Sequence, residues 1–248
     1  MERVSAADLV GDVSAEPVCA PSPPVRDPRP PRIPPYLREV YAWAYLNPRS
    51  VRLLDHRFVA NAILWGNYRR LSDAAIAEFA PGMRVLQPAC AYGDVSPRLA
   101  RALGPEGHLE MADVAPVQLR NVRPKLAPFP HTRLAHRDAA DTPRARFDAV
   151  NCFFLIHEIP EAHRRRVVDA LLDAVVPGGK IVFVDYHRPA GWHPLKPLMS
   201  LVFDTLEPFA KGLWEQEIRD MARAADRFTW SKTTYFGGLY QKVTATTR

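Results

Sequence analysis

The chain has few cysteines and no long apolar run. Its three cysteines, Cys19, Cys90 and Cys152, lie far apart in the 248 residues and form no Cys-x-x-Cys pair. That spacing excludes the usual zinc-binding pattern and a disulfide framework, and it fits the reducing cytoplasm. No uninterrupted apolar stretch approaches the ~20 residues that a membrane-spanning helix needs. Residues 1–19 also lack the basic start and apolar core of a secretory signal, so we expect a cytoplasmic protein.

The chain also lacks an extreme composition. Hydrophobic residues make up 47% and charged residues 24%, which excludes a wholly disordered chain, a coiled coil and a collagen-like repeat. A small excess of basic residues, 33 against 27 acidic, gives a net charge of +6. This charge suits an anionic surface, either a membrane or a nucleic acid. Because the basic residues do not gather with interleaved aromatics in one strip, we expect no nucleic-acid partner.

Proline, in contrast, is abundant near the start of the chain. Between Pro17 and Pro35 nearly every second residue is proline, and proline cannot donate a hydrogen bond to a helix or a sheet. We therefore expect residues 1–35 to be a disordered tail. A proline tract that binds a partner protein is the alternative.

Residues 36–80 are rich in tyrosine and tryptophan, and apolar residues recur there at helical spacing with arginines between them. This pattern predicts two or three helices. Such helices can form a lid over an apolar ligand or rest on a membrane surface. Ordinary packing of the helices against the main domain is the alternative.

From Met83 onward, predicted strands and helices alternate. Helix patterns begin near Ser96, Pro116 and Pro160, between the apolar runs that predict strands. This alternation indicates an α/β fold with a mostly parallel sheet covered on both faces. We expect the domain to span residues 81–248, with a helical insertion at 190–214 and an antiparallel hairpin at the C-terminal edge. The strands are expected at 83–87, 108–112, 132–136, 147–154, 180–185, 228–235 and 239–244, with a turn at Pro177-Gly178-Gly179.

Ligands of an open parallel sheet bind outside the carboxyl ends of its strands, so the polar residues at those ends are the first candidates for a site. Asp113 ends the second predicted strand, at the spacing at which an acidic side chain binds ribose hydroxyls. A capping role for the helix that begins at Pro116 is the alternative. The other strand-end candidates are Gln87, Tyr92, Asp94, Asp138, His157, Glu158, Asp185 and His187.

The order of elements resembles the class I methyltransferases that use S-adenosylmethionine (SAM), which implies a Rossmann-like fold with SAM as cofactor. In that family, residues that match Asp113 and Asp138 contact the ribose and the adenine. The motifs that carry the resemblance are Val85 to Gly93, Asp113, Asp138-Ala139, Phe147 to Val150 and Pro177 to Gly179. The positions that would contact SAM are Gln87, Ala89, Gly93, Asp113, Asp138 and Ala139.

The glycine-rich loop of that family is altered in this chain. Gln87 stands where the family has an acidic residue, and Ala89 and Ala91 stand at two of its glycine places, so only Gly93 remains. Glycine permits positive φ angles and close approach of a ligand to the backbone. The alteration indicates that the amino-acid end of SAM is held differently; neutral drift of the loop is the alternative.

Further segments resemble the RquA proteins of rhodoquinone biosynthesis, a divergent methyltransferase-like family. They are Ala91 to Ser96, Leu155 to Pro160, Asp185 to Pro189, Glu207-Pro208-Phe209 and Tyr235 to Lys242. The resemblance implies conversion of ubiquinone to rhodoquinone, a quinone of anaerobic respiration, by exchange of a ring methoxy group for an amino group. It also implies SAM as the amino donor and a divalent metal, Mn²⁺, as a cofactor.

The strand-end residues offer groups suited to this chemistry. Displacement of methoxide requires a neutral amine, and the α-amino group of SAM has a pKa of roughly 8 in water, so a nearby base can deprotonate it. A divalent metal would polarise the quinone oxygen, and manganese accepts oxygen ligands and imidazole. The candidate catalytic residues are Tyr92, Asp94, His157 and Glu158, and the candidate metal ligands are Asp94, His157, Glu158, Asp185 and His187. Helix-end or ion-pair roles for these acidic residues are the alternative.

Other functions stay open. One is a conventional SAM-dependent methyltransferase of a quinone or a small aromatic substrate, and another is a non-catalytic SAM-fold protein, against which the clustered ionisable groups argue. A nucleic-acid methyltransferase is disfavoured because the chain has no Asn-Pro-Pro-Tyr or Pro-Cys motif. Because ubiquinone is a membrane lipid, we expect peripheral contact with the inner face of the cell membrane through residues 36–80 and the apolar stretch Trp192 to Trp214.

Overall fold

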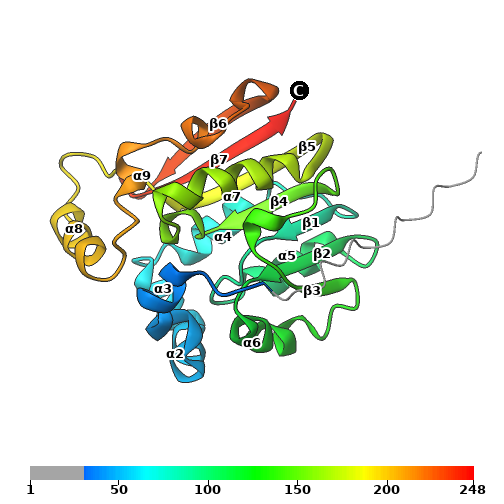
Figure 1. Cartoon of the computed structure of the whole chain (residues 1–248), viewed down its shortest axis with the longest axis horizontal. Coiled ribbons are helices and arrows are strands. Elements are labelled where there is room, and N and C mark those ends of the chain that lie inside the picture. The colour runs from blue at the N-terminus through cyan, green and yellow to red at the C-terminus, as the bar shows by residue number, and fades with distance from the viewer. Residues whose placement is uncertain (1–30) are drawn as a thin grey trace, which may run out of the picture.

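The computed structural model of the chain describes residues 31–248. The predicted proline-rich tail, residues 1–35, lies outside the described residues except for its last five positions. The remaining chain folds around one central sheet, and short helices gather at one end of that sheet (Figure 1).

The central sheet has seven strands in the order β3-β2-β1-β4-β5-β7-β6. Strands β1 to β5 pair in parallel, whereas β7 runs antiparallel to both β5 and β6. The predicted α/β fold, with a mostly parallel sheet and an antiparallel C-terminal hairpin, is therefore confirmed. The strands are β1 (Arg84–Gln87), β2 (His108–Asp113), β3 (Thr132–His136), β4 (Phe147–Phe153), β5 (Val175–Tyr186), β6 (Phe228–Tyr235) and β7 (Tyr240–Thr247).

The middle strands are apolar along their whole length because both of their faces are covered. In β4, Phe147, Ala149, Val150 and Cys152 are all buried, although alternate residues point to opposite faces of the sheet. On one face, α4 (Tyr68–Ile76) packs beside α5 (Val95–Leu103), and α5 packs beside α6 (Pro116–Leu126). On the other face lies α7 (Glu161–Asp173), which Figure 1 shows. The short helix α10 (Ile218–Met221) packs beside α7.

Helix ends are marked by residues that suit their backbone geometry. Pro116 opens α6, where its missing N–H is not needed. Gly104 follows α5 with φ +70°, in the left-handed region that a glycine adopts without strain. The helix starts expected near Ser96, Pro116 and Pro160 agree closely with the observed starts at Val95, Pro116 and Glu161.

Strand β5 begins earlier than predicted. The turn expected at Pro177-Gly178-Gly179 lies inside the strand, which starts at Val175. The pairing with β4 jumps from Phe147↔Val175 to Ala149↔Lys180, so the intervening residues form an irregular bulge. Gly178 has φ +78° within this bulge. A proline and two glycines signal a turn in sequence, but here they absorb extra residues within a continuous strand.

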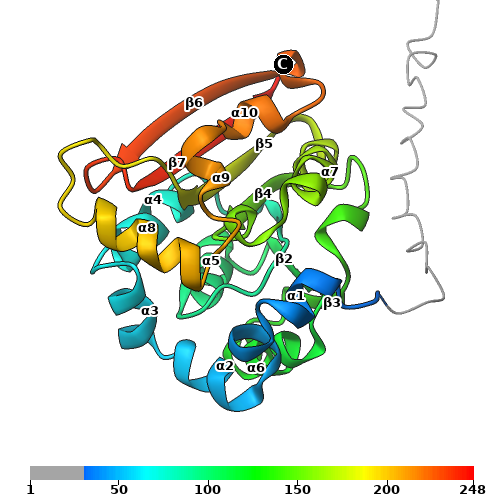
Figure 2. The same cartoon turned by 60° about the vertical axis from the view of Figure 1, so that its left-hand side comes forward.

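Short helices from two distant parts of the chain lie together at the carboxyl end of the parallel strands, and two of them, α3 and α8, are on the left of Figures 1 and 2. The lid role predicted for residues 36–80, and the insertion at 190–214, stay interpretations of this arrangement. Within residues 31–248, no helix is both long and apolar enough to cross a bilayer. The short helices at this end of the sheet come first from the N-terminal part: α1 (Pro35–Glu39), a π-helical turn (Ala42–Leu46), α2 (Pro48–Leu54) and α3 (Arg57–Ile63). The second part contributes α8 (Lys196–Thr205) and α9 (Gly212–Glu215).

Candidate functional site

A single cavity of about 440 Å³ lies at the carboxyl ends of the parallel strands. Its volume is typical of small-molecule sites, which span roughly 300–1,000 Å³. Its walls come from the loops after β1, β2 and β4, from the end of β5, and from α3 and α8. Asp113, Asp138 and His157 all line it. The residues predicted from separate strand ends therefore share one chamber.

Asp113 ends β2 and faces the cavity with its carboxylate already held by backbone groups. Its Oδ1 accepts a hydrogen bond from the Ala115 N–H at 2.8 Å, and its Oδ2 accepts one from the Cys90 N–H at 2.9 Å. Burial raises the pKa of Asp113 to about 6, against the opposing effect of these hydrogen bonds. The carboxylate is therefore fixed in place, and its remaining lone pairs can accept from a ligand hydroxyl.

Gln87 points into the protein and not into the cavity. Its amide Nε2 donates to Ser96 Oγ and to the Ala89 carbonyl, both at 3.1 Å. The side chain is fully buried and ties the end of β1 to the first turn of α5. Gln87 thus holds the shape of the altered loop.

Gly93 is confined by Tyr68 of α4. It has φ +86°, and a Cβ at this position would lie 2.5 Å from Tyr68 Oη. The same phenol oxygen accepts the backbone N–H groups of Asp94 and Val95, each at 2.7 Å. These are unpaired N–H groups at the start of α5, so Tyr68 caps that helix where an anion would otherwise bind.

Asp55, after α2, fastens the N-terminal helices to the same loop. Its Oδ1 accepts from the Gly93 N–H at 2.9 Å and from Lys125 Nζ at 2.7 Å, and its Oδ2 accepts from Asn121 Nδ2 at 2.8 Å. Lys125 also donates to the Gly93 carbonyl at 2.7 Å. The backbone N–H of Gly93 is therefore occupied by this chain's own carboxylate.

Tyr92 joins the loop to the π-helical turn above it. Its hydroxyl donates to the Ala44 carbonyl at 2.6 Å and accepts from Gln118 Nε2 at 3.1 Å. Its ring stacks on Tyr45, with centroids 5.6 Å apart and planes 20° apart. Both aromatic rings line the cavity, so together they form a flat aromatic wall.

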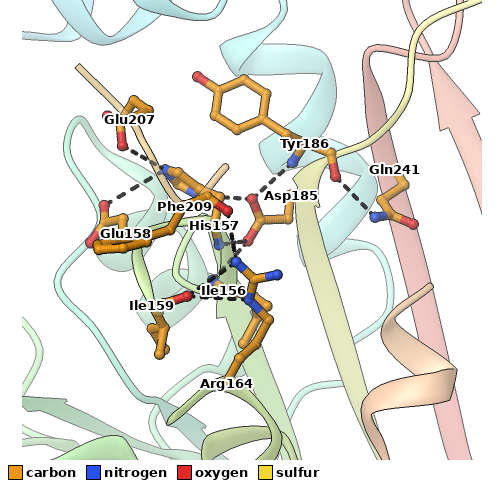
Figure 3. A network of polar contacts seen from close by, with 10 residues as sticks. All are labelled: Ile156, His157, Glu158, Ile159, Arg164, Asp185, Tyr186, Glu207, Phe209 and Gln241. Carbon is orange, nitrogen blue, oxygen red and sulfur yellow. Dashed lines mark hydrogen bonds and ion pairs between the residues drawn. The ribbon is translucent and has the colours of Figure 1, made fainter. Parts of the chain in front are cut away.

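A cluster of ionisable side chains faces the cavity beyond the end of β4 (Figure 3). His157 Nδ1 lies 2.8 Å from Asp185 Oδ1. Its other nitrogen, Nε2, lies 3.8 Å from Glu158 Oε1 and 4.0 Å from Glu207 Oε2. Because Asp185 accepts from Nδ1–H, the Nε2 atom is the one left to exchange a proton with the cavity.

Asp185 is held more tightly than any other member of this cluster. Its Oδ2 accepts the backbone N–H of Ile156 at 2.8 Å, and its Oδ1 accepts that of Tyr186 at 2.8 Å. Four donors, counting His157 Nδ1 and the His157 N–H at 3.3 Å, surround its two oxygens. Asp185 is therefore a positioning residue that orients the His157 ring.

The charges of the cluster shift one another. Burial alone would lower the pKa of His157, but the charge of Asp185, its hydrogen bond, and the carboxylates of Glu207 and Glu158 raise it to about 9. Burial, assisted by the charge of Glu207, raises the pKa of Glu158 to about 8 against the opposing charge of His157. Burial likewise raises the pKa of Glu207. The cluster thus contains groups that exchange protons near neutral and mildly alkaline pH.

Arg164 sets the position of Glu207. From α7, its Nη2 donates to the Phe209 carbonyl at 2.7 Å and to the Ile159 carbonyl at 3.1 Å (Figure 3). The guanidinium is buried, and it joins the loop after β4 to the segment that follows α8. Glu207 enters the cavity two residues before Phe209, so the arginine fixes the carboxylate against His157.

We expect Arg164→Ala to lower the free energy of unfolding by about 1–3 kcal/mol. Of the two carbonyls that Arg164 contacts, that of Ile159 is left without a donor, whereas that of Phe209 still accepts from the Gly212 N–H at 3.2 Å. Arg164→Lys, which can reach one of them, should lose less. Urea denaturation followed by circular dichroism measures both variants. Equal stability of wild type and Arg164→Ala would contradict the assigned role.

Residues 85–179 match the sequence profile of a family described as a methyltransferase domain. The ubiquinone/menaquinone biosynthesis C-methyltransferase UbiE of Ectopseudomonas mendocina is 27% identical over 153 residues, which cover 58% of this chain and 57% of that protein. The demethylmenaquinone methyltransferase of Listeria monocytogenes is 28% identical over 173 residues, covering 62% of this chain and 71% of that protein. The chain spans a little under three fifths of the first of these relatives.

Solved structures share the architecture. The N-methyltransferase NodS of Bradyrhizobium japonicum, in complex with S-adenosyl-L-homocysteine, has a TM-score of 0.54 at 15% identity, covering 86% of this chain and 98% of that one. An O-methyltransferase family protein from Burkholderia thailandensis has a TM-score of 0.59 at 15% identity, covering 77% and 59%. The chain has the class I SAM-dependent methyltransferase fold. Together with the family match, these findings support a SAM-dependent enzyme.

The methyltransferase fold brings most of the predicted site residues to the cavity, but not all. Asp185 lies behind His157, and the Asp94 backbone is turned to Tyr68. His187 Nδ1 lies 2.8 Å from the Gly238 carbonyl, on the side of the hairpin. Direct catalytic or SAM-binding roles remain predictions for all these positions. Predicted residues that line the cavity are Ala89, Tyr92, Asp113, Asp138, Ala139, His157 and Glu158, and those that do not are Gln87, Gly93, Asp94, Asp185 and His187.

The predicted metal ligands do not form one site. Within residues 31–248, no three His, Cys, Asp or Glu side chains are grouped so that they could hold a metal ion. Both oxygens of Asp185 accept hydrogen bonds from backbone N–H groups. His187 Nε2 lies 3.8 Å from Glu217 Oε1, away from the cluster around His157. The carboxylates of Glu158 and Glu207 approach the same atom, His157 Nε2, at 3.8 and 4.0 Å, and pair with the ring. Because Asp185 and His187 are engaged elsewhere, the predicted donor set does not fit the divalent metal.

Some cavity residues of this methyltransferase fold were not predicted as site residues. Glu207 and Tyr186 line the cavity, and Tyr45 and Trp65 complete its aromatic wall. For Glu207 a signal was present, because it belongs to a segment that resembles the rhodoquinone family. The same holds for Tyr186, in the segment Asp185 to Pro189. Tyr45 and Trp65 lie in the N-terminal helical segment with no motif, and only the packing of the chain shows where they face.

Proposed function

We propose that this chain is a SAM-dependent enzyme that modifies a quinone ring, and that it converts ubiquinone to rhodoquinone by exchanging a ring methoxy group for an amino group. The proposal depends on one observation: a single cavity is lined both by Asp113 and Asp138 and by the cluster of His157, Glu158 and Glu207. A nucleoside-binding region and a proton-exchanging cluster therefore open on the same apolar chamber.

The segments that resemble the rhodoquinone family meet at this cavity, which supports the finer assignment. Tyr92, Glu158, Tyr186 and Glu207 each come from a different one of those segments, and all four line the cavity. Relatives of the chain are named as methyltransferases of ubiquinone and menaquinone synthesis, which favours a quinone as the substrate here.

The cavity residues suit SAM. The fixed Asp113 carboxylate can accept from the ribose hydroxyls, while Asp138, whose Oδ1 accepts from the Ala140 N–H at 2.9 Å, and Ala139 border the place of the adenine. Bound there, SAM would supply the transferred group, its amine in the exchange reaction. We place the enzyme at the cytoplasmic side of the membrane that contains ubiquinone.

The ionisable cluster suits the displacement step. In that step a bond forms between the amine nitrogen and a ring carbon, the bond from that carbon to the methoxy oxygen breaks, and methanol leaves with a proton from the amine. The bond from this nitrogen to Cα of SAM then breaks, and water supplies a hydroxyl group to Cα and a proton to the nitrogen, so that the amino group stays on the ring. Glu158, with its pKa raised to about 8, matches an α-amino group of pKa roughly 8 and can accept the proton that the amine loses. His157, with its pKa raised to about 9, stays protonated at neutral pH and can donate from Nε2 to the quinone oxygen.

Turnover is expected to follow a bell-shaped pH profile with its maximum between about 8 and about 9. The rate rises as Glu158 loses its proton, because only the carboxylate is a base. It falls as His157 loses its proton, because the neutral ring no longer donates from Nε2. Glu158→Gln should abolish the rising limb and retain SAM binding. A profile of Glu158→Gln identical to the wild type would exclude Glu158 as the base.

A conventional C-methyltransferase of a quinone precursor is the second candidate, and the relatives favour it because their names describe this reaction. The same cavity would serve, with the methyl group of SAM transferred and His157 or Glu158 accepting a ring proton. The two candidates differ in the mass and composition of the product.

One assay separates these candidates. Purified full-length protein is incubated with SAM and either a short-tailed ubiquinone or its demethylated precursor. Each substrate is tested in parallel with Mn²⁺ and with EDTA, and the quinone is analysed by mass spectrometry. Loss of a methoxy group with gain of an amino group supports the exchange reaction. An added methyl group on a demethylated precursor supports the conventional reaction, and unchanged quinones in every arm contradict both. Equal rates with EDTA and with Mn²⁺ would agree with the absence of an assembled metal site in the described residues.

A further inference from the structure

The large apolar side chains that are exposed are confined to two segments of the described chain. The first covers residues 43–65 and the second covers residues 192–206. Phe58 and Leu201 are among the most exposed, at 66% and 59%. Elsewhere within residues 31–248 no large apolar side chain is comparably exposed. The members are Trp43, Leu53, Phe58, Ile63, Trp65, Trp192, Leu198, Leu201 and Leu206, and we call them the apolar face.

The two segments are in contact although they are more than a hundred residues apart in sequence. Trp65 Nε1 donates to Met199 Sδ at 3.3 Å, which joins the end of α3 to α8. Figures 1 and 2 both show α3 and α8 close together at the same end of the molecule. Exposed apolar residues gathered in this way mark an interaction surface.

The cavity opens in the middle of the apolar face. Trp43, Ile63, Trp65 and Leu206 are exposed to solvent and also line the cavity. The lining continues inward through Met199 and apolar residues of α3 to the ionisable cluster of His157, Glu158 and Glu207. A long apolar chain attached to a ring in the cavity would therefore emerge among these exposed side chains.

The charge beside the apolar face is positive. Arg49, Arg52 and Arg57 are exposed, and within the described residues none of them forms an ion pair. The acidic residue among them, Asp55, is turned inward to Lys125 at 2.7 Å. Exposed arginines bordering tryptophan, phenylalanine and leucine are typical of a surface that rests in the interface of an anionic membrane.

We propose that the apolar face docks on the headgroup region of an anionic lipid leaflet, so that a quinone ring enters the cavity between α3 and α8 while its tail stays in the bilayer. The proposal rests on the proposed quinone substrate. Phe58 and Leu201 insert beside the mouth, and the arginines contact lipid phosphates. A lipid occupant fits better than a protein partner because the face surrounds the open mouth of an apolar cavity and borders unpaired cations.

Vesicle flotation of the full-length protein tests the docking without quinone or SAM. We expect binding to vesicles of phosphatidylcholine with phosphatidylglycerol, and weaker binding to phosphatidylcholine alone. Phe58→Ser with Leu201→Ser should weaken binding to both by about tenfold or more. Arg52→Gln with Arg57→Gln should weaken binding to the vesicles that contain phosphatidylglycerol and leave binding to phosphatidylcholine alone unchanged. Arg101→Gln with Arg133→Gln, which removes the same charge from elsewhere on the surface, is the matched control and should bind as the wild type.

The failure of this proposal is distinguishable from failure of the proposed function. Phe58 and Leu201 do not line the cavity. The double serine variant should therefore turn over a short-tailed quinone in solution at the wild-type rate. It should lose turnover of a long-tailed quinone that is held in vesicles. No vesicle binding by the wild type, or undiminished binding by the serine variant, would overturn the docking proposal. Vesicle binding without any quinone turnover would contradict the proposed function and leave the docking surface supported.

Discussion

Replacing His157 by alanine is expected to lower turnover by about 100- to 10,000-fold, the range that a positioned general acid or base contributes. The reason is geometric. His157 Nδ1 is fixed by Asp185 at 2.8 Å, so Nε2 is the atom that faces the cavity, between two carboxylates. Alanine removes the ring nitrogen that we propose donates to the quinone oxygen. It also removes the charge that keeps Glu158 and Glu207 compatible in one buried site.

SAM affinity should be nearly unchanged in this variant, because His157 lies apart from the Asp113 carboxylate and its backbone donors. Titration calorimetry and steady-state rates on the same preparation separate the two effects. Asp185→Asn is the matched variant, since it keeps the volume and most backbone contacts but loses the charge that orients the ring. If the two residues act as a unit, the double variant should be about as slow as His157→Ala alone. Wild-type turnover by His157→Ala would instead make this histidine a packing residue.

The fold could be predicted from the sequence because its local signals agree with its packing. Strand β4 is buried on both faces, so its sequence is one apolar run, and α6 begins at Pro116 as its sequence indicates. The start of β5 could not be predicted in the same way. Pro177 to Gly179 have turn chemistry, and only the pairing with β4 keeps them extended as a bulge.

The candidate site could be predicted where topology alone decides the position of a residue. Asp113, Asp138 and His157 follow parallel strands, and the carboxyl ends of such strands meet at one edge of a sheet. Glu207 does not follow a strand. Its place against His157 depends on Arg164, which connects two loops through their carbonyl oxygens, and no local pattern in the sequence encodes that connection.

The altered glycine-rich loop illustrates the same limit of local patterns. The sequence shows only that glycines and an acidic residue are missing. The structure shows compensating contacts from outside the loop: Tyr68 caps α5, and Asp55 accepts the Gly93 N–H. Gln87 secures the loop from inside. Tyr68 and Asp55 come from the helical segment that precedes the sheet, so the loop and the N-terminal helices are held together by these hydrogen bonds.

Replacing Asp113 by alanine is expected to weaken SAM binding by about 100-fold or more. Two ribose hydroxyls donating to a charged acceptor contribute roughly 1.5–3 kcal/mol each, and about 1.4 kcal/mol corresponds to a factor of ten in affinity. Titration calorimetry measures the loss. Because Asp113 also accepts from the Cys90 and Ala115 N–H groups, alanine loosens the loop as well. Asp113→Asn keeps one acceptor in place and should therefore lose less affinity.

The pH dependence of SAM binding distinguishes a ribose contact from a purely structural role of Asp113. Burial raises the pKa of this carboxyl to about 6, so in the free protein it gains a proton as the pH falls through that value. A protonated carboxyl accepts fewer hydrogen bonds, and wild-type affinity for SAM should decrease below about pH 6. Asp113→Asn carries no titrating group and should show no such decrease. If the affinity for SAM falls equally in the wild type and in Asp113→Asn, the titrating group lies elsewhere. Full affinity in Asp113→Ala would exclude the ribose contact, because a cavity that holds the nucleoside without this carboxylate must bind it through other residues.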